Sequence, residues 1–213
     1  RFVYDTKDAM GMNMATIATS EAAEVIEAET PAELVALSGN LCSDKKPAAI
    51  NAIEGRGQTV SADVVLSRSY VEERLDTTPE AMVETNTRKN LVGSAKAGSL
   101  GFNAQVANTV AAIFLATGQD EAHVVDGANA ITTMAIRTDE NGEDGLYASI
   151  SFASLAIGTV GGGTGLPTQR EALSILGHAG GGDPPGANAE AFAEVVAVAG
   201  LAGELSLVAA VTA

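Results

Sequence analysis

The segment SGNLCSDKKPAAINAIEGRG, residues 38–57, is the one around which the rest of the chain is expected to be arranged. It places two adjacent lysines, Lys45 and Lys46, beside Asp44 in a sequence that is otherwise poor in lysine. Pro47 suits the first position of a helix, and the alanines behind it favour propagation of that helix. The segment therefore predicts a loop, then a helix, with three charged side chains at the helix start.

A lysine at this place has two interpretations. The helix dipole, the neighbouring lysine and any burial favour its neutral form, whereas Asp44 opposes them. Such a lysine can polarise a carbonyl oxygen or stabilise a developing oxyanion. The simpler interpretation is a solvated charged turn, because charged clusters before helices are common. The segment alone leaves both open.

Composition limits the class of protein. The chain has 213 residues, of which 46% are hydrophobic and only 4% aromatic, so aliphatic side chains must fill a sizeable core. The formal net charge of −15 argues against nucleic acid or an anionic membrane surface as a partner. The acidic composition also suggests a salt-rich cytoplasm, with an ordinary acidic protein as the alternative.

The single cysteine, Cys42, rules out an internal disulfide framework and favours a reducing compartment, which we expect to be the cytoplasm. Because no histidine neighbours it in the sequence, Cys42 is predicted to be a small buried packing residue. Residues 195–213 are apolar but interrupted by Glu204, which predicts a buried helix and no membrane span. The missing initiator methionine and the abrupt end suggest a fragment.

Hydrophobic periodicity predicts a mixture of helices and strands. The clearest helix covers residues 106–117, where apolar side chains share one face and Gly118 suits the C-terminal cap. A second helical pattern covers residues 15–29. The expected strands are residues 33–37, 60–66, 130–137 and 146–159, and an acidic turn over residues 138–145 joins the last two.

Local signals predict two further helix starts and one ligand loop. Thr77 or Thr78 can cap a helix that runs to about Asn90. Asn188 can cap the last helix. The glycine triplet at 161–163 permits close approach of the backbone to a ligand, although flexible turns give the same pattern.

Four segments together resemble one enzyme family. The lysine segment is similar to the catalytic-lysine segment of 3-hydroxy-3-methylglutaryl-coenzyme A reductases. Three other segments resemble the same family in the family order: DAMGMNM at 8–14, GFNAQVANTVAAIFLATGQD at 101–120 and IGTVGGGTGLPTQ at 157–169. Four long motifs in register are far more specific than any short pattern. The similarity runs through essentially the whole chain and is greatest to the class I form of archaea and eukaryotes.

The resemblance implies an α/β (α+β) fold. Residues 38–213 would form an incomplete large domain for substrate binding and catalysis, with a long central helix. Residues 1–37 would be the tail of an inserted, ferredoxin-like, NADP-binding small domain. The chain contains no G-x-G-x-x-G motif, which agrees with a nucleotide site that is not a Rossmann fold.

The resemblance also implies roles for single residues. Lys45 would stabilise the oxyanion formed at the thioester carbonyl and then at the aldehyde, and Asp120 would hold Lys45 charged. No metal site is expected. The implied substrate-binding residues are Ser38, Asn40, Lys46, Lys89 and Asn108, and the implied cofactor-binding residues are Asp8, Met10, Gly11, Met12, Asn13, Gly161 and Gly162.

Simpler roles exist for several of these residues. A methionine-rich helix start is more often core than cofactor site. Lys89 can be an ordinary cation near a helix C-terminus, and Asn108 can be an ordinary solvated helix residue. Gln105 departs from a histidine that is common in class I relatives at a substrate contact.

The function implied is the NADPH-dependent reduction of hydroxymethylglutaryl-CoA to mevalonate and coenzyme A, by a homodimer or larger assembly with shared active sites. Two other classes stay open: a Schiff-base lyase built on Lys45, and a non-catalytic module that binds acyl-CoA or nucleotide. Residues 1–213 alone are expected to be inactive, because neither histidine lies in the family's histidine motif. His123 is predicted to lie in a surface loop, and His178 before a glycine loop.

Overall fold

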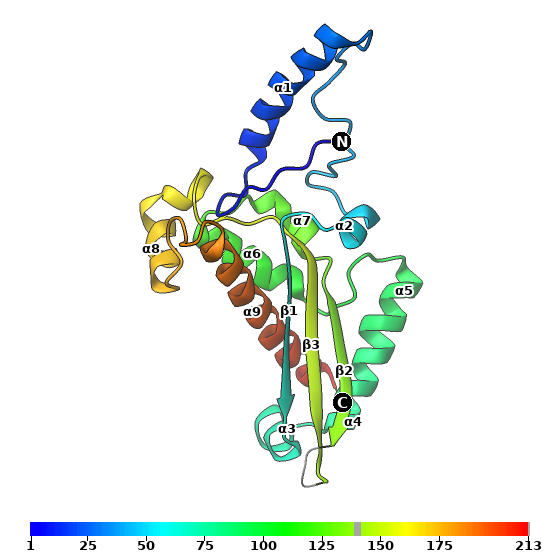
Figure 1. Cartoon of the computed structure of the whole chain (residues 1–213). Helices are drawn as coiled ribbons and strands as arrows, with labels where there is room; N and C mark the ends of the chain where they lie inside the picture. Colours follow the sequence, from blue (N-terminus) through cyan, green and yellow to red (C-terminus); the bar gives the residue numbers. More distant parts are fainter. Residues whose placement is uncertain (139–141, 213) are drawn as a thin grey trace.

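The computed structural model describes residues 1–138 and 142–212 and has a mixed helical and β architecture, which confirms the predicted α+β class (Figure 1). Its strands are β1 (Gln58–Leu66), β2 (Ile131–Thr138) and β3 (Asp144–Leu155). Its helices are α1 (Met12–Glu29), α2 (Ala49–Glu54), α3 (Arg68–Leu75), α4 (Pro79–Thr85), the π-helix η1 (Asn86–Gly93), α5 (Ser94–Ala97), α6 (Val106–Thr117), the 3₁₀ helix η2 (Glu121–His123), α7 (Val124–Gly127), the 3₁₀ helix η3 (Gly162–Gly165), α8 (Pro167–Ile175) and α9 (Ala187–Val211).

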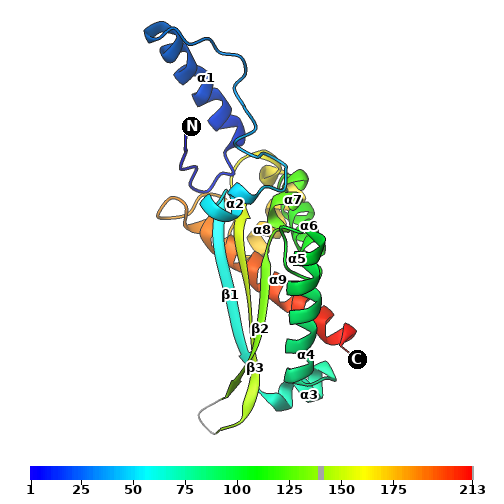
Figure 2. The same ribbon diagram turned by 90° about the vertical axis from the view of Figure 1, so that its right-hand side faces the viewer.

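The three strands form an antiparallel sheet in the order β1-β3-β2, so β3 is the central strand. Every second side chain of β3 from Leu146 to Phe152 is buried, as the predicted alternation requires. Helix α9 packs across this face, and Gly200 allows it to lie directly against Phe152. The views in Figures 1 and 2 place α9 on one face of the sheet and the continuous helical rod α4–η1–α5 beside β2.

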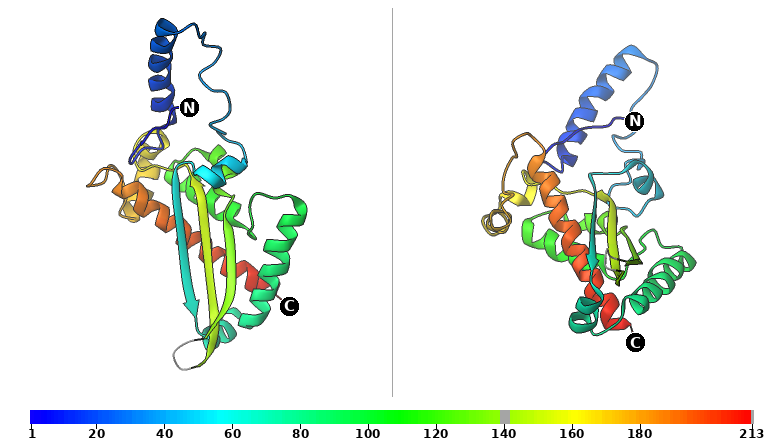
Figure 3. Two further views of the ribbon diagram at one scale, coloured as in Figure 1. Left: turned by 45° about the vertical axis from the view of Figure 1, so that its right-hand side comes forward. Right: turned by 60° about the horizontal axis from the view of Figure 1, so that its bottom comes forward.

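The opposite face of the sheet carries small polar side chains. The Ser61 hydroxyl donates to Ser151 across β1 and β3, and the hydroxyls of Thr133 and Ser149 are hydrogen-bonded across β2 and β3. Helix α1 and the N-terminal segment project beyond one end of the sheet, on the side where α2 and α7 lie (Figure 3). The candidate site described below lies at this end.

Helix α9 is long and apolar enough to span a membrane by length and composition, but it packs on β1 and β3. In its middle, the Glu204 carboxylate is completely buried. It accepts hydrogen bonds from the backbone N–H groups of Ala104 (2.8 Å) and Gln105 (2.7 Å) and from the Thr132 hydroxyl (2.9 Å). Glu204 therefore fixes α9 to the start of α6 and to β2, and the predicted buried helix is confirmed.

Changing Glu204 to alanine should lower the free energy of unfolding of the intact protein by roughly 2–5 kcal/mol, because three buried donors lose their acceptor. Glu194→Ala is the matched control, since Glu194 is exposed on the same helix. Denaturant-induced unfolding measures both variants. Equal stability of the two variants would show that the buried carboxylate does not hold α9 in place.

Several predicted boundaries hold. Strand β1 contains the predicted residues 60–66, and β2 and β3 lie within two residues of the predicted starts. On α6, Val106, Val110 and Phe114 are buried, and Gly118 ends the helix in the left-handed conformation (φ 71°). Thr78 caps α4 by accepting a hydrogen bond from Ala81 N–H. The predicted turn 138–145 includes residues 139–141, which lie outside the described residues.

Other predictions are wrong. No strand forms over residues 33–37, because no strand of the sheet lies beside that segment; the Leu34 N–H instead donates to the Glu27 carboxylate (2.7 Å). Helix α2 begins at Ala49 and not at Pro47. The helix that Thr78 starts does not end near residue 90 but continues through η1 and α5 to Ala97.

The long helices also differ from expectation. The predicted central helix, α6, has 12 residues, and α9 is the longest helix with 25. Asn188 does not cap α9, because Gly186 occupies the cap position and a distant carboxylate already accepts from Asn188 N–H. Helix α3 was not predicted; Ser67 caps it by accepting a hydrogen bond from Tyr70 N–H.

Candidate functional site

The lysine loop, residues 38–48, brings Lys45 against Asp120. The Lys45 ammonium lies 2.9 Å from the Asp120 carboxylate, which follows the C-terminal end of α6. Three residues of the loop adopt positive φ: Asn40 (60°), Ser43 (48°) and Lys45 (59°). Residues other than glycine rarely adopt this backbone conformation, and such backbone strain concentrates at functional sites. The loop therefore holds Lys45 in a specified conformation.

The pairing determines the charge of both groups. The hydrogen bond to Asp120 raises the pKa of Lys45 above its ordinary value of 10.5. Burial acts to raise the pKa of Asp120, but the hydrogen bonds from Lys45 and from Ala122 N–H prevail and lower it below 3.8. Of the two sets of effects weighed from the sequence, those that favour the charged form of Lys45 therefore prevail. The Lys45 side chain is 45% exposed, and Asp120 outweighs burial, which acts to lower the pKa of Lys45.

The GQD motif, residues 118–120, is fixed to the segment that contains the glycine triplet, residues 157–163. The Gln119 side chain donates to the carbonyl of Gly158 and accepts from its N–H, both at 2.9 Å. Gly118 lies so close to Gly163 that a Cβ on Gly118 would come within 2.3 Å of the Gly163 carbonyl oxygen. These contacts hold Asp120 at a defined place relative to the glycine triplet.

Asp8 joins the N-terminal motif to the same loop. Its carbonyl accepts from Thr159 N–H (2.7 Å) and Val160 N–H (3.2 Å), and Ala9 forms a parallel bridge with Val160. Its buried carboxylate accepts four backbone N–H groups around the start of α9, namely those of Gly182 (3.0 Å), Gly186 (2.7 Å), Asn188 (3.1 Å) and Ala189 (3.1 Å).

Burial acts to raise the pKa of Asp8, but these four donors prevail and hold the pKa below 3.8. Both carboxylate oxygens are occupied by the protein's own backbone. We therefore expect Asp8 to position the cofactor motifs and not to contact a ligand with its carboxylate. The contact with NADP that the resemblance implies for Asp8 stays a prediction.

Asp8→Asn should lower the free energy of unfolding by about 1–3 kcal/mol. The amide carries no charge, and its NH2 group would face backbone N–H donors. Since the folded-state pKa is depressed, this stability is present above the ordinary pKa of 3.8 and is lost as pH falls through the folded-state value. Unfolding curves from neutral to acid pH measure it. Asp5→Asn is the control, because Asp5 is exposed; a difference that persists unchanged below the folded-state pKa contradicts the assignment.

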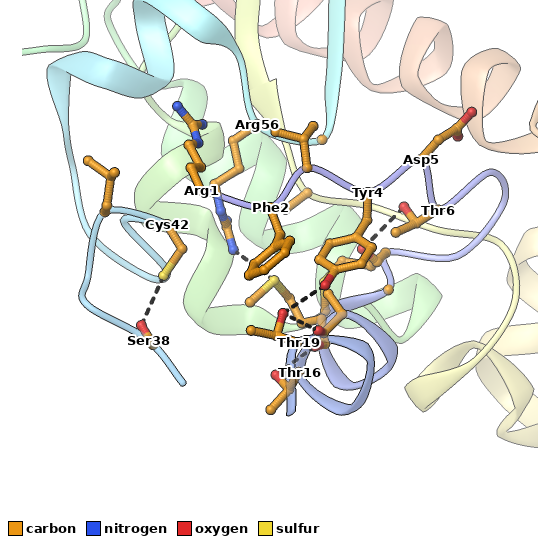
Figure 4. Close-up of a pocket in the computed structure, with 18 of the residues that line it drawn as sticks. Arg1, Phe2, Tyr4, Asp5, Thr6, Thr16, Thr19, Ser38, Cys42 and Arg56 are labelled. Carbon is orange, nitrogen blue, oxygen red and sulfur yellow. Dashed lines mark hydrogen bonds between the residues drawn. The ribbon is translucent and has the colours of Figure 1, made fainter. Parts of the chain in front are cut away.

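A cleft of about 860 Å³ lies between the N-terminal segment, α1 and the lysine loop. Figure 4 shows Phe2 and Tyr4 of the N-terminal segment among the residues that line it, together with Cys42 of the lysine loop and Arg56, which follows α2. The predicted residues Met10, Gly11, Met12 and Ser38 also line the cleft.

The remaining predicted cofactor residues, Asn13, Gly161 and Gly162, do not line this cleft. Asn13 lies exposed in the first turn of α1. Gly161 (φ 80°) and Gly162 (φ 54°) are exposed, and a Cβ on either glycine would meet open space. The positive φ at these two positions explains why glycine occupies them, and the open space permits a ligand to approach the backbone.

The predicted substrate residues fall into two groups. Ser38, Asn40 and Lys46 lie on the lysine loop itself, exposed to solvent. Lys89 lies on η1 and donates to Asn90, and Asn108 lies near the start of α6 and donates to Gln105. Neither Lys89 nor Asn108 forms a hydrogen bond or ion pair with the lysine loop among residues 1–138 and 142–212.

Two predictions about single residues are wrong. Cys42 is exposed and not a buried packing residue, and the hydrogen bond with Ser38 lowers its pKa. His123 is completely buried and not in a surface loop. It lies behind Lys45 with Asp126 and Arg56, neither of which the sequence singled out as a site residue. For Asp126 the sequence held one signal: Asp120, His123 and Asp126 are spaced by three residues, which places them on one side of a helical turn.

Comparison with known proteins places this geometry in context. A family model described as hydroxymethylglutaryl-coenzyme A reductase matches residues 1–213. The 3-hydroxy-3-methylglutaryl-coenzyme A reductases of Halobacterium salinarum and Haloferax volcanii are each 71% identical over 210 residues, which is 99% of this chain and 51% of each relative. The enzyme of that name from Pyrococcus horikoshii is 61% identical over 214 residues, 100% of this chain and 51% of the relative. The chain thus spans about half the length of the curated relatives it matches.

Proposed function

This chain belongs to the hydroxymethylglutaryl-coenzyme A reductase family, and on that basis we propose that the intact protein reduces 3-hydroxy-3-methylglutaryl-CoA to mevalonate and coenzyme A with NADPH. The observation that carries the proposal is the Lys45–Asp120 pair at the junction of the four family motifs. The two halophilic relatives agree with the acidic composition of the chain.

Lys45 is proposed to act as a fixed cation. Its ammonium group donates a hydrogen bond to the thioester carbonyl oxygen and stabilises the negative charge that develops there, first on the thioester and then on the aldehyde. Asp120 keeps Lys45 protonated and oriented, as the raised pKa of Lys45 supports. Ser38, Asn40 and Lys46 lie on the same loop and are proposed to bind the hydroxymethylglutaryl group.

The cofactor is proposed to lie in the 860 Å³ cleft. Met10, Gly11 and Met12 line it. Gly161 and Gly162 do not line it, but the open space beside their backbone permits a ligand to approach closely. When bound, NADPH supplies hydride to the substrate carbon. The chain's own part is to orient that carbon against Lys45 and to limit access of water.

We also propose that two copies share the site. Lys89 and Asn108 lie on η1 and α6, away from the lysine loop in the hydrogen-bond network of one chain. A homodimer can bring them to the lysine loop of a second copy. Size measurement of the intact protein, together with mixing of Lys45→Ala and Lys89→Ala copies, tests this: restored activity in the mixture supports a shared site, and no restoration contradicts it.

One experiment separates the proposal from the other classes. NADPH absorbance is followed in high salt after hydroxymethylglutaryl-CoA is added to the intact protein, with NADH in a parallel reaction. Faster oxidation of NADPH supports the proposal. A borohydride-trapped adduct on Lys45 without oxidation indicates a Schiff-base lyase, and ligand-dependent stabilisation without turnover indicates a binding module. The raised pKa of Lys45 disfavours the lyase, because a Schiff base forms from the neutral amine.

A further inference from the structure

His123 is the centre of a buried charge cluster behind Lys45. Its Nδ1 lies 2.9 Å from Asp126 Oδ2, and its Nε2 lies 3.3 Å from Asp44 Oδ1 and 3.8 Å from Asp120 Oδ2. The ring thus touches a carboxylate at one nitrogen and faces two carboxylates at the other. The side chains of His123 and Asp126 are 0% exposed and those of Asp44 and Asp120 are 30% and 31% exposed, so water screens these charges less than in bulk solvent.

Arg56 completes the cluster. Its guanidinium lies 2.7 Å from Asp44 Oδ1 and 3.2 Å from Asp126 Oδ2. Arg56 Nη1 and His123 Nδ1 are 3.1 Å apart, and both contact Asp126 Oδ2. The Asn51 amide donates to the other oxygen of Asp126 (3.2 Å), and the Ser43 hydroxyl donates to Asn51. Asp126 is therefore held from three sides.

The charges of this cluster balance only if the ring is charged. Three carboxylates, those of Asp44, Asp120 and Asp126, face two permanent cations, Arg56 and Lys45. In the described part of the chain, His123 Nε2 is buried without a hydrogen-bond partner, yet it lies near two carboxylate oxygens. A lone pair there would face negative charge, whereas only the imidazolium has an N–H at both nitrogens.

We propose that His123 is an imidazolium that positions the active-site carboxylates: it is anchored by Asp126, and its positive charge attracts Asp44 and Asp120 so that Asp120 presents its Oδ2 to Lys45. The proposal rests on the proposed function for its catalytic meaning. His123 is completely buried and faces the proposed site only through neighbouring side chains, so it is a positioning residue. It acts through Asp120, whose Oδ2 lies between Lys45 Nζ (2.9 Å) and His123 Nε2 (3.8 Å).

The first test measures the charge of the ring without reference to turnover. Nitrogen-15 NMR of the intact protein, labelled at histidine, should show at neutral pH one imidazolium that is missing in His123→Gln and kept in His178→Gln. Asp126→Asn removes the carboxylate that anchors Nδ1, so the imidazolium signal at neutral pH should be lost or weakened in that variant. If His123→Gln does not fold, the change of this signal in Asp126→Asn still identifies the ring. A neutral imidazole at His123 overturns the proposal.

The second test measures turnover with NADPH and hydroxymethylglutaryl-CoA. His123→Gln keeps a polar side chain but cannot carry the charge, so kcat should fall about 10- to 100-fold with KM changed much less, because misplaced catalytic groups lose rate. The pH profile of kcat should differ from that of the wild type, because the variant lacks a positive charge that faces Asp120. His178→Gln, which changes the other histidine of the chain, should keep wild-type kcat and pH profile.

Unchanged kcat and pH profile in His123→Gln would overturn the positioning role. The two hypotheses fail separately. If the wild-type protein shows no turnover at all, the proposed function fails, and the NMR measurement still decides the charge of His123. If the wild-type protein turns over but the ring is neutral, the proposed function stands and the inference about His123 fails.

Discussion

Replacing Lys45 with alanine in the intact protein should lower kcat by at least about 10²–10³-fold, the loss expected when one preorganised donor to an oxyanion is removed. A full charge is lost as well, so the effect can be larger. Binding of NADPH should be nearly unchanged, because the cleft that is proposed to hold it is lined by other residues. Steady-state kinetics and a fluorescence titration of NADPH measure the two effects.

Lys46→Ala is the matched control. Lys46 follows Lys45 directly, but its ammonium donates to the Asp44 carbonyl (2.8 Å) and not to Asp120. We expect it mainly to raise KM for the acyl-CoA. If Lys45→Ala kept near-wild-type turnover and Lys46→Ala did not, the wrong lysine has been assigned.

Asp120→Asn should depress kcat about 10- to 100-fold and more than it raises KM, because its proposed role is to support Lys45 electrostatically in the transition state. The charge of Asp120 raises the pKa of Lys45, so the pKa of Lys45 should fall in this variant. Any loss of activity caused by deprotonation of Lys45 should therefore begin at lower pH in Asp120→Asn. A pH profile of kcat measures this shift.

Glu121→Gln controls for the loss of an acidic side chain next to the site, because Glu121 is adjacent but exposed. It should keep both kcat and its pH dependence. A rise in KM with unchanged kcat in Asp120→Asn would instead indicate that Asp120 only positions the substrate.

The pattern of hydrophobic residues was enough to predict those helices and strands whose buried side chains recur at regular spacing. Strand β3 alternates from Leu146 to Phe152, and the apolar face of α6 repeats at helical spacing, so both could be found without any tertiary information. The pairing of Lys45 with Asp120 was expected only from the family resemblance, because the two residues are far apart in the sequence.

Several features that the sequence did not reveal depend on distant contacts. Asp8 accepts N–H groups at the start of α9, so the expected cap by Asn188 was not needed. His123 is buried because Arg56 and Asp44 come to it from the segment around the lysine loop. Residues 33–37 have the composition of a strand, but no strand of the sheet lies beside them. Such contacts leave no local periodic signal.

The most direct test of the central claim is the ratio of NADPH oxidised to coenzyme A released when the intact protein acts on hydroxymethylglutaryl-CoA. NADPH is followed by absorbance, and the free thiol is titrated in the same reaction. A four-electron reduction with Lys45 as the oxyanion-stabilising cation predicts two NADPH for each coenzyme A in the wild type, and neither signal in Lys45→Ala. Release of coenzyme A without oxidation of NADPH, or an undiminished two-to-one ratio and rate in Lys45→Ala, would contradict it.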